Sequence, residues 1–555
     1  MRLRLARAGG IGEMRGMSRT AAFFIIALLW AAMWLPGLGS TEIRDGEARS
    51  ILPAVAMLES GDWLVPQLNG RPSLAKPPLA SWAVALSFQW LGRRDEWAAR
   101  LPSALCVLAL CGVMIAVSAP RTRSMLTPEV AFIASVFLLT TAGLLAKARF
   151  AGAEGAGIHA PLAGMGIVLW MAWWQQGRSP WLTWTVPFAP LGLAALADMP
   201  LHLVFFYAIV LAVLWHAKEC RLLAHPAHFA GLLIAGAICA AWAVQLFRAV
   251  PEAGRVWWEQ VAGRSDNYAM NIPRGLFDLL PWVVFAPVLR ECIDAWEGRE
   301  RALVRGAAIA GTACFFIVLL IPAMRPPDVL PLAAPLAVLF ALAVGDEALA
   351  PPSDALRRWW RTNSGVALGL IAIACVAPAL VVLGEKQRVN VGGERFGGPA
   401  TLLIWPLLAS ACAIVIGLVV FIGRLRLARP TRIAGASAAL AGAASMLYAG
   451  SAVPFIHRAE RFRPLAAEID SAIPSGARVV IFDAGDQPTL FYVRSRYTLA
   501  RAIRDIPADT DWIITRREHV AELQWEHAGL IVSRDFPCGK DDHLVLMKWE
   551  RHRWI

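Results

Sequence analysis

Charged residues are scarce in this sequence. They make up 17% of its 555 residues, whereas hydrophobic residues make up 57%. A soluble protein of this length needs a more polar surface, so the composition excludes one. The net charge of +12 would suit a nucleic-acid partner, but arginines in short loops between spans follow the positive-inside rule more simply. We therefore expect a polytopic membrane protein that contacts membrane lipids and binds no nucleic acid.

Other absences narrow the function further. Cys538 is the only one of nine cysteines in the C-terminal segment, so no disulfide framework is predicted there. The same segment contains no glycine-rich phosphate loop, since "DAGDQP" is too weak a match for one. No internal repeat is visible, and the charges cluster outside the apolar runs rather than in their middle. Both observations argue against a secondary transporter.

Apolar runs separated by polar breaks predict about 13 transmembrane helices. The first 19 residues hold five arginines and one acid, so we place the N-terminus in the cytoplasm. No small-residue cleavage signature follows residue 38, so we expect an uncleaved first span. The predicted spans lie near 20–38, 98–118, 127–146, 158–175, 181–197, 199–216, 227–248, 276–290, 304–323, 329–347, 365–383, 400–423 and 432–453.

The composition changes at about residue 455 to that of a soluble domain. "ARVVIFDA", "TDWIITR", "GLIVSRDF" and "HLVLMKWE" are typical of short strands, and "RFRPLAAEIDSAI" is typical of a helix. This alternation predicts a small α/β domain, which an odd number of spans places on the outer face. The expected organisation is therefore a basic cytoplasmic N-terminus (1–19), a transmembrane domain (20–454) and an extracytoplasmic α/β domain (455–555).

A long outer loop, residues 39–97, separates the first two predicted spans. It begins with the charged stretch "STEIRDGEARS" and later contains "LAKPPLASW". "EARSILPAVAML" and "PPLASWAVALSFQWL" are amphipathic stretches of helix length, which we expect to lie along the membrane with Trp63 and Trp82 at headgroup level. The charges would then lie where a lipid phosphate sits. The alternative is that they flank the first span and pair with one another.

The order of these motifs resembles that of the GT-C membrane glycosyltransferases that use polyprenyl-phosphate sugars. "TEIRDGE", "ESGDWLVPQLNGRP" and "AKPPLASW" follow one another as in that family, and its lipid A aminoarabinose transferases and protein O-mannosyltransferase-like members are the most similar. The resemblance implies a multi-pass transferase of the bacterial inner membrane. It would move a sugar from a polyprenyl-phosphate donor to a lipid, such as lipid A, or to a protein on the extracytoplasmic face. A non-catalytic protein that binds or translocates lipid-linked sugars is the alternative.

The resemblance also implies a set of basic residues around the donor phosphate. Lys76 matches the lysine of the Lys-Pro-Pro motif, and its proline neighbours fix the backbone that carries the ammonium. Arg44 matches the arginine of the first motif. "ARFAGAEG" matches a motif of the second outer loop and places Arg149 beside the site. These cations would neutralise the departing phosphate.

A later outer loop combines aromatic and basic residues. Aromatic faces stack on sugars, and guanidinium groups bind phosphate through paired hydrogen bonds. The alternative for the tryptophans is an interfacial aromatic belt with snorkelling arginines. Trp257, Trp258 and Tyr268 are the expected sugar or lipid contacts, and Arg255 and Arg264 are further candidates for the phosphate.

Transfer also needs a carboxylate that takes the acceptor proton. Glu154 is the acid matched by the resemblance, with glutamate in place of aspartate. Glu42 matches the second residue of the first motif. If a helix begins at Thr41, Asp45 lies one turn further on nearly the same face, although it would equally pair with Arg49 as a surface charge.

Several positions depart from the family pattern. Thr41 replaces the leading aspartate, and a hydroxyl cannot act as a base near neutral pH. Ala75 removes an acid that would ligate a metal, and Asp198 in "LADMP" stands where the family has lysine. Either the site is rearranged or catalysis has been lost. A divalent metal stays open as a cofactor, with His159 and His202 as ligands or, alternatively, as hydrogen-bonding residues between helices.

Overall fold

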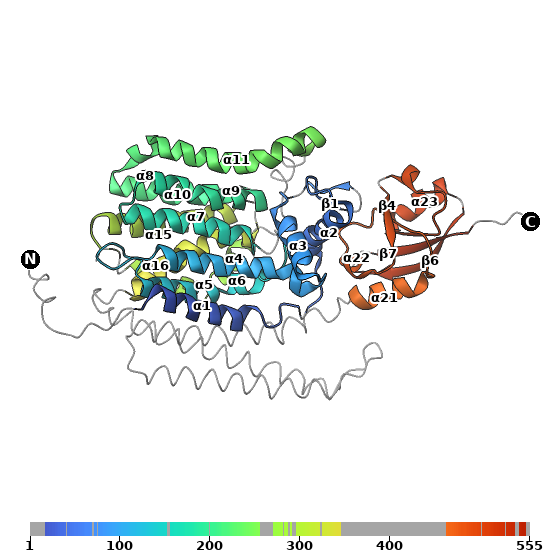
Figure 1. Ribbon diagram of the computed structural model, residues 1–555, viewed down its shortest axis with the longest axis horizontal. Coiled ribbons are helices and arrows are strands. Elements are labelled where there is room, and N and C mark those ends of the chain that lie inside the picture. Colours follow the sequence, from blue (N-terminus) through green and yellow to red (C-terminus); the bar gives the residue numbers. More distant parts are fainter. Residues whose placement is uncertain are drawn as a thin grey trace, which may run out of the picture.

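The computed structural model describes two parts of the chain, and Figure 1 shows how their elements are arranged. These parts are residues 17–345 and 462–550, without 40, 69–70, 75, 153–155, 199, 256–269, 281, 287–288, 291–292, 294–295, 322–324, 501, 528 and 539–542. The last three predicted spans, 365–383, 400–423 and 432–453, lie outside the described residues.

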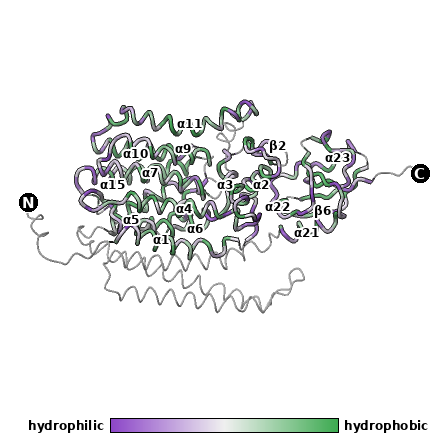
Figure 2. The backbone as a smooth tube through the Cα atoms, in the orientation of Figure 1, coloured by the Kyte–Doolittle hydropathy of each residue, from purple (hydrophilic) through white to green (hydrophobic). Residues whose placement is uncertain are grey.

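A bundle of apolar helices forms the larger part of the molecule (Figures 1 and 2). Three of the described helices are long and apolar enough to cross a membrane, and several shorter helices are apolar too. The three long helices are α4 (Glu96–Val117), α11 (Pro226–Ala249) and α15 (Gly298–Leu319). The other helices of this part are α1 (Arg19–Trp34), α5 (Pro128–Leu139), α6 (Ala142–Lys147), α7 (His159–Gln175), α8 (Pro180–Thr185), α9 (Phe188–Ala197), α10 (Leu201–Ala217), η3 (Cys220–Ala224), α13 (Asn271–Asp278), η5 (Trp282–Phe285), η7 (Pro326–Leu332) and α16 (Ala333–Gly345).

Among the described residues, two of the predicted spans each form two α-helices. The run 127–146 forms α5 and α6. At the break, the hydroxyl of Thr140 donates a hydrogen bond to the carbonyl oxygen of Val136, and that of Thr141 donates one to the carbonyl oxygen of Phe137, and such bonds compete with the helical ones. The run 181–197 forms α8 and α9, and Pro187 directly precedes α9. The mainly helical fold is confirmed, while the number of complete spans stays a prediction.

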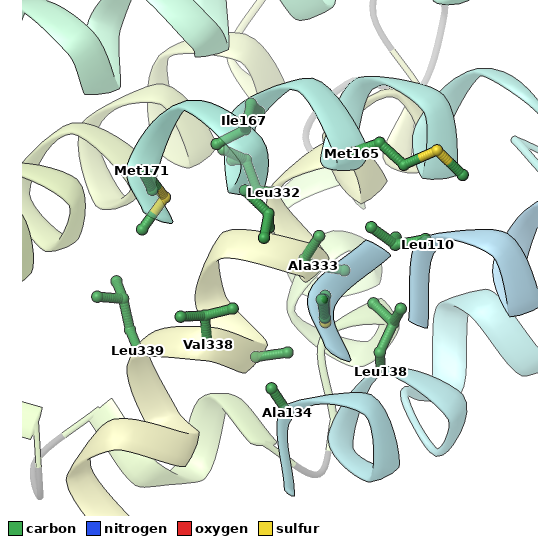
Figure 3. Close-up of a cluster of buried hydrophobic side chains, with 14 of the residues drawn as sticks. Leu110, Ala134, Leu138, Met165, Ile167, Met171, Leu332, Ala333, Val338 and Leu339 are labelled. Carbon is green, nitrogen blue, oxygen red and sulfur yellow. The ribbon is translucent and has the colours of Figure 1, made fainter. Parts of the chain in front are cut away.

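The helix α7 lies in the middle of the bundle and packs against α4, α9 and α16. Nearly all of its side chains are buried, since its sequence is apolar around the whole circumference. Figure 3 shows Met171 of α7 pointing toward Leu339 of α16, while Met165 of α7 lies on the side of Leu110 of α4. Close packing around one apolar helix fixes both of its ends, and the end at His159 contributes to the candidate site.

The first outer loop forms two helices between the bundle and the C-terminal domain (Figure 1). The helix α2 (Asp45–Ser60) begins after Arg44, whose backbone N–H donates to Glu47 Oε2 at 3.2 Å. The helix therefore does not begin at Thr41, as the sequence analysis considered. The remaining elements of the loop are a short hairpin, β1 (Gln67–Leu68) with β2 (Arg71–Pro72), and α3 (Leu79–Leu91).

The predicted C-terminal α/β domain is confirmed and contains a mixed five-stranded sheet in the order β4-β3-β5-β7-β6. The strand β3 pairs in parallel with β4 and β5, while β7 pairs antiparallel with β5 and β6. The elements are α21 (Phe462–Ala472), β3 (Val479–Phe482), α22 (Thr489–Tyr492), β4 (Tyr497–Ala500), η9 (Ile503–Asp505), β5 (Trp512–Arg516), η10 (Arg517–His519), α23 (Val520–Glu526), β6 (Leu530–Pro537) and β7 (His543–Trp549).

The two faces of this sheet have different partners. Side chains alternate along a strand, so Val479 and Ile481 share one face of β3 and Val480 and Phe482 share the other. The first face belongs to a hydrophobic core that also includes α2 and α3, and Phe88 of α3 stacks on Phe491 with ring centres 6.2 Å apart. The C-terminal domain is thus packed directly on the first outer loop.

Candidate functional site

Lys76, Asp198 and His159 meet where three elements end or begin. Lys76 precedes Pro77 and Pro78, which lead into α3, while Asp198 follows the last residue of α9 and His159 is the first residue of α7. The ammonium of Lys76 donates to Asp198 Oδ1, and His159 Nδ1 lies 3.5 Å from Asp198 Oδ2. The side chain of Lys76 is 34% exposed, and that of Asp198 is 8% exposed. Lys76 is thus the more exposed partner of this ion pair, and Asp198 is buried.

A second carboxylate lies close to these three residues. Asp328 is the third residue of η7, which follows Arg325, and the backbone N–H of Arg325 donates to Asp328 Oδ2 at 2.7 Å. Asp328 lies within electrostatic reach of Asp198, Lys76 and His159. We call these four residues the Lys76 cluster. It combines one accessible lysine with two acids and a histidine, so it can bind an anion at its surface and hold a proton behind it.

The metal hypothesis finds no support in the part of the chain that the structure describes. Among those residues, no three His, Cys, Asp or Glu side chains are grouped closely enough to hold a metal ion. His202 Nε2 lies 2.9 Å from the carbonyl oxygen of Leu191, which is the hydrogen bond between helices that was the alternative to a ligand role.

A buried ion pair anchors the first outer loop. Arg100, which is 2% exposed, binds Glu47 through two hydrogen bonds of 2.8 Å. Its remaining nitrogen, Nη1, donates to the carbonyl oxygens of Leu38 and Thr41 at 2.8 and 2.9 Å. Glu47 Oε1 also accepts from the backbone N–H of Ala151 at 2.9 Å. One ion pair thus joins the end of α1, α2, α4 and the loop between α6 and α7.

No role was predicted from the sequence for either member of this pair. Glu47 ends the first motif, and Arg100 lies in an apolar run near its start. Charged residues at such positions usually face the protein interior and pair with one another. The charge of Arg100 inside an apolar run could therefore have indicated a buried ion pair. The two residues are 53 positions apart, so no local spacing identifies the partner.

Arg149 also lies in the interior of this region. Its guanidinium donates to the carbonyl oxygens of Trp34, at 3.2 Å, and Pro36 at the end of α1. Burial, and the charge of Arg100, lower the pKa of Arg149 to about 10. These contacts support the loop between α1 and α2, and a contact with a donor phosphate stays a prediction.

The other predicted basic and aromatic residues have different surroundings or lie outside the described residues. The guanidinium of Arg44 lies over the ring of Phe150, 4.4 Å from its centre. Arg255 is exposed beyond the end of α11. The remaining candidates of that loop, Trp257, Trp258, Arg264 and Tyr268, lie outside the described residues.

The three predicted catalytic carboxylates are not brought together by described contacts. Glu42 Oε2 accepts from the backbone N–H groups of Phe462, at 2.5 Å, and Arg463, at 3.2 Å, at the start of α21. This gives Glu42 a structural role in holding the C-terminal domain. Asp45 is the first residue of α2, and Glu154 lies outside the described residues. The catalytic roles of all three stay predictions.

A second polar group joins the C-terminal domain to the bundle. Tyr492 donates its hydroxyl hydrogen to Glu96 Oε1 at 2.6 Å and accepts from the backbone N–H of Ile43 at 2.8 Å. Arg463 donates to the same Glu96 oxygen at 2.5 Å. Glu96 is 2% exposed, so its charge is compensated within this junction.

We expect alkaline pH to weaken this junction. Burial, followed by the hydrogen bond to Glu96, raises the pKa of Tyr492 above its ordinary value. The folded protein therefore holds the neutral phenol more firmly than the unfolded chain, and this stabilisation is present below about pH 10 and lost above it. Tyr492→Phe should be less stable at pH 8 and should lose stability less steeply between pH 9 and 11. Thermal unfolding across this range measures both, and equal slopes in the two proteins would contradict the prediction.

Comparison with known proteins gives two distant sequence relatives, while no family model matches the chain. The chain is 23% identical over 419 residues to an undecaprenyl phosphate-alpha-4-amino-4-deoxy-L-arabinose arabinosyl transferase of Shewanella sediminis, covering 69% of this chain and 70% of the relative. It is 26% identical over 357 residues to the enzyme of the same name from Edwardsiella ictaluri, covering 59% of this chain and 60% of the relative.

The fold is also found among solved structures. ArnT from Cupriavidus metallidurans, crystallised with undecaprenyl phosphate, matches with a TM-score of 0.66 and 17% identity over 95% of this chain and 98% of that one. The apo structure of the same protein matches with the same TM-score over 97% of its chain. The resemblance expected from the sequence is thus confirmed: the chain has an ArnT-like GT-C glycosyltransferase fold and is a distant relative of the arabinosyl transferases.

Proposed function

We propose that the protein is an integral-membrane glycosyltransferase that moves a sugar from a polyprenyl-phosphate donor to a lipid or protein acceptor. The observation that carries this proposal is Lys76, a partly exposed lysine whose ammonium is held near the start of α3 by a buried carboxylate. A phosphate dianion is the leaving group of such a donor, and a fixed cation stabilises it. The binding of undecaprenyl phosphate by the structural relative supports a lipid phosphate as the ligand.

The same proposal gives the protein its orientation. The N-terminus lies in the cytoplasm of a bacterium, and the Lys76 cluster and the C-terminal domain lie on the periplasmic side of the inner membrane. The packing of the C-terminal domain on the first outer loop supports a common side for both. A non-catalytic protein that binds or translocates lipid-linked sugars is the second candidate, and Thr41, Ala75 and Asp198 favour it because they depart from the family's polar positions.

Reversing the charge of Lys76 tests the proposal. In Lys76→Glu the site presents a carboxylate beside Asp198, so binding of undecaprenyl phosphate and transfer of a radiolabelled sugar from a polyprenyl-phosphate donor should both be lost. Transfer is measured with purified protein and cell lipids or cell proteins as acceptors. Lys218→Glu is the matched control. The helix α10 begins three residues after Asp198, and Lys218 is exposed directly after its last residue, about 25 Å from its start along the helix axis.

The outcomes separate the two candidates. Donor binding with no transfer to any acceptor in the parent protein would select the binding protein. Undiminished binding of undecaprenyl phosphate in Lys76→Glu would show that the Lys-Pro-Pro segment is only structural and would contradict the assignment of the site.

A further inference from the structure

The carboxylate of Asp198 has a different neighbour at each of its oxygens. Oδ1 accepts a hydrogen bond from the Lys76 ammonium, and Oδ2 faces His159 Nδ1 at 3.5 Å. Asp198 and His159 are 8% and 7% exposed, and the side chain of Lys76 is 34% exposed. Lys76 is therefore the most exposed of the three side chains, and it is bonded to the buried carboxylate.

An anion bound at Lys76 competes with Asp198 for the same ammonium. A carboxylate beside a cation is a weak base, and it becomes a stronger base when the cation turns away. Asp328, on the adjacent η7, is the second acid of the cluster, and burial raises its pKa. His159 also faces Asp198, from the start of α7. Arg325 contributes a backbone N–H to Asp328.

We propose that Asp198 accepts the acceptor's proton during transfer and that the donor phosphate activates it by drawing Lys76 away. The inference rests on the proposed function. The acceptor hydroxyl gives its proton to Asp198 as its oxygen bonds to C1 of the sugar. The bond between C1 and the phosphate oxygen breaks, and its electron pair leaves with the polyprenyl phosphate. Lys76 neutralises the charge that develops there, and His159 is a positioning residue that restrains the second oxygen of Asp198.

Other described acids near the first outer loop are committed to structural contacts. Both oxygens of Glu47 bind Arg100, and Glu42 binds the backbone at the start of α21. Glu96 binds Tyr492 and Arg463 at the junction between the domains. Asp198 differs from them because its cation is Lys76, the residue proposed to bind the donor phosphate.

The test is Asp198→Asn, which keeps the shape of the side chain and removes its ability to take a proton. Binding of undecaprenyl phosphate should be retained or become several-fold tighter, because no carboxylate competes for Lys76. Transfer should fall by about 10²–10⁴-fold. Asp278→Asn is the matched control, since Asp278 is 3% exposed and pairs with Lys147, which is 30% exposed, outside the Lys76 cluster. It should bind and transfer like the parent protein.

Each outcome decides a separate question. If the parent neither binds undecaprenyl phosphate nor transfers sugar, the proposed function fails, and this inference with it. If the parent transfers and Asp198→Asn transfers within tenfold of it, only the inference is overturned. Loss of lipid binding together with transfer in Asp198→Asn would reduce Asp198 to a support for Lys76 and would also overturn it.

Two further variants complete the test. Glu154→Gln separates Asp198 from Glu154, the acid expected by resemblance. Full transfer in Glu154→Gln supports Asp198 as the base. Loss of transfer in Glu154→Gln, together with full transfer in Asp198→Asn, refutes the assignment to Asp198. Asp198→Glu keeps a carboxylate and should retain at least a tenth of the parent transfer. If Asp198→Asn does not fold, Asp198→Ser answers the same question with a smaller neutral side chain.

Discussion

Arg100→Met is expected to lower the free energy of unfolding by about 3–5 kcal/mol, because it leaves the Glu47 carboxylate buried without its cation. Arg100 is 2% and Glu47 3% exposed, so water cannot replace the lost hydrogen bonds. The carbonyl oxygens of Leu38 and Thr41 lose their donor as well. The first outer loop should therefore detach from α4, which thermal unfolding in detergent and faster proteolysis of residues 39–97 would measure.

Two controls test the physical cause. Arg517→Met breaks an exposed pair in which the Arg517 side chain is 65% and that of Asp535 35% exposed, and such a pair contributes about 1 kcal/mol or less. The double variant Arg100→Met with Glu47→Leu removes the buried charge and should recover part of the lost stability. If the double variant is less stable than Arg100→Met, the buried carboxylate is not the source of the effect.

Gly152→Val is expected to lower the free energy of unfolding by about 2–5 kcal/mol, through backbone strain and overpacking together. Gly152 has a φ of +92°, a conformation that a valine adopts only with strain. An added Cβ would lie 2.5 Å from Ser50 Cβ and still nearer to the Ser50 hydroxyl. The loop between α6 and α7 must then move away from α2, and the hydrogen bond from Ala151 to Glu47 should be lost. Unfolding measurements and hydrogen exchange at Ala151 report the two effects.

Gly61→Ala separates strain from overpacking. Gly61 has a φ of +73°, but an added Cβ would meet nothing within 4 Å. Only the backbone term, about 1–2 kcal/mol, should appear there. Combining Gly152→Val with Ser50→Gly removes most of the clash and should restore stability relative to Gly152→Val alone. A double variant no more stable than Gly152→Val would show that strain alone accounts for the loss.

Periodic apolar patterns made much of the fold predictable from the sequence. The buried strands β3 and β5 were found because their apolar runs are short and flanked by turn residues. The strand β4 was missed, since most of its side chains are at least partly exposed and its sequence lacks such a run. The break between α5 and α6 was missed too, because it depends on threonine hydroxyl groups that bond to the backbone inside an apolar run.

The candidate site was predictable only where residues lie next to one another. Lys76 could be singled out because two prolines follow it, but its partner Asp198 is 122 positions away. No pattern in either segment indicates the pair, since it results from packing of α3 and α9 at their ends. The motif of Arg149 suggested a phosphate ligand, which stays a prediction, but it did not indicate the carbonyl oxygens at the end of α1 that accept hydrogen bonds from Arg149.

The contacts of the C-terminal domain also set an order in time. Glu42 binds the backbone of Phe462, 420 positions later, and Ile43 binds Tyr492, 449 positions later. A ribosome that adds 5–20 residues per second needs roughly 20–80 s to make 420 residues. During this interval Glu42 and Glu96 have been synthesised without the groups that they bind in the finished protein. Maturation of the first outer loop therefore has to wait for the last domain of the chain to be translated.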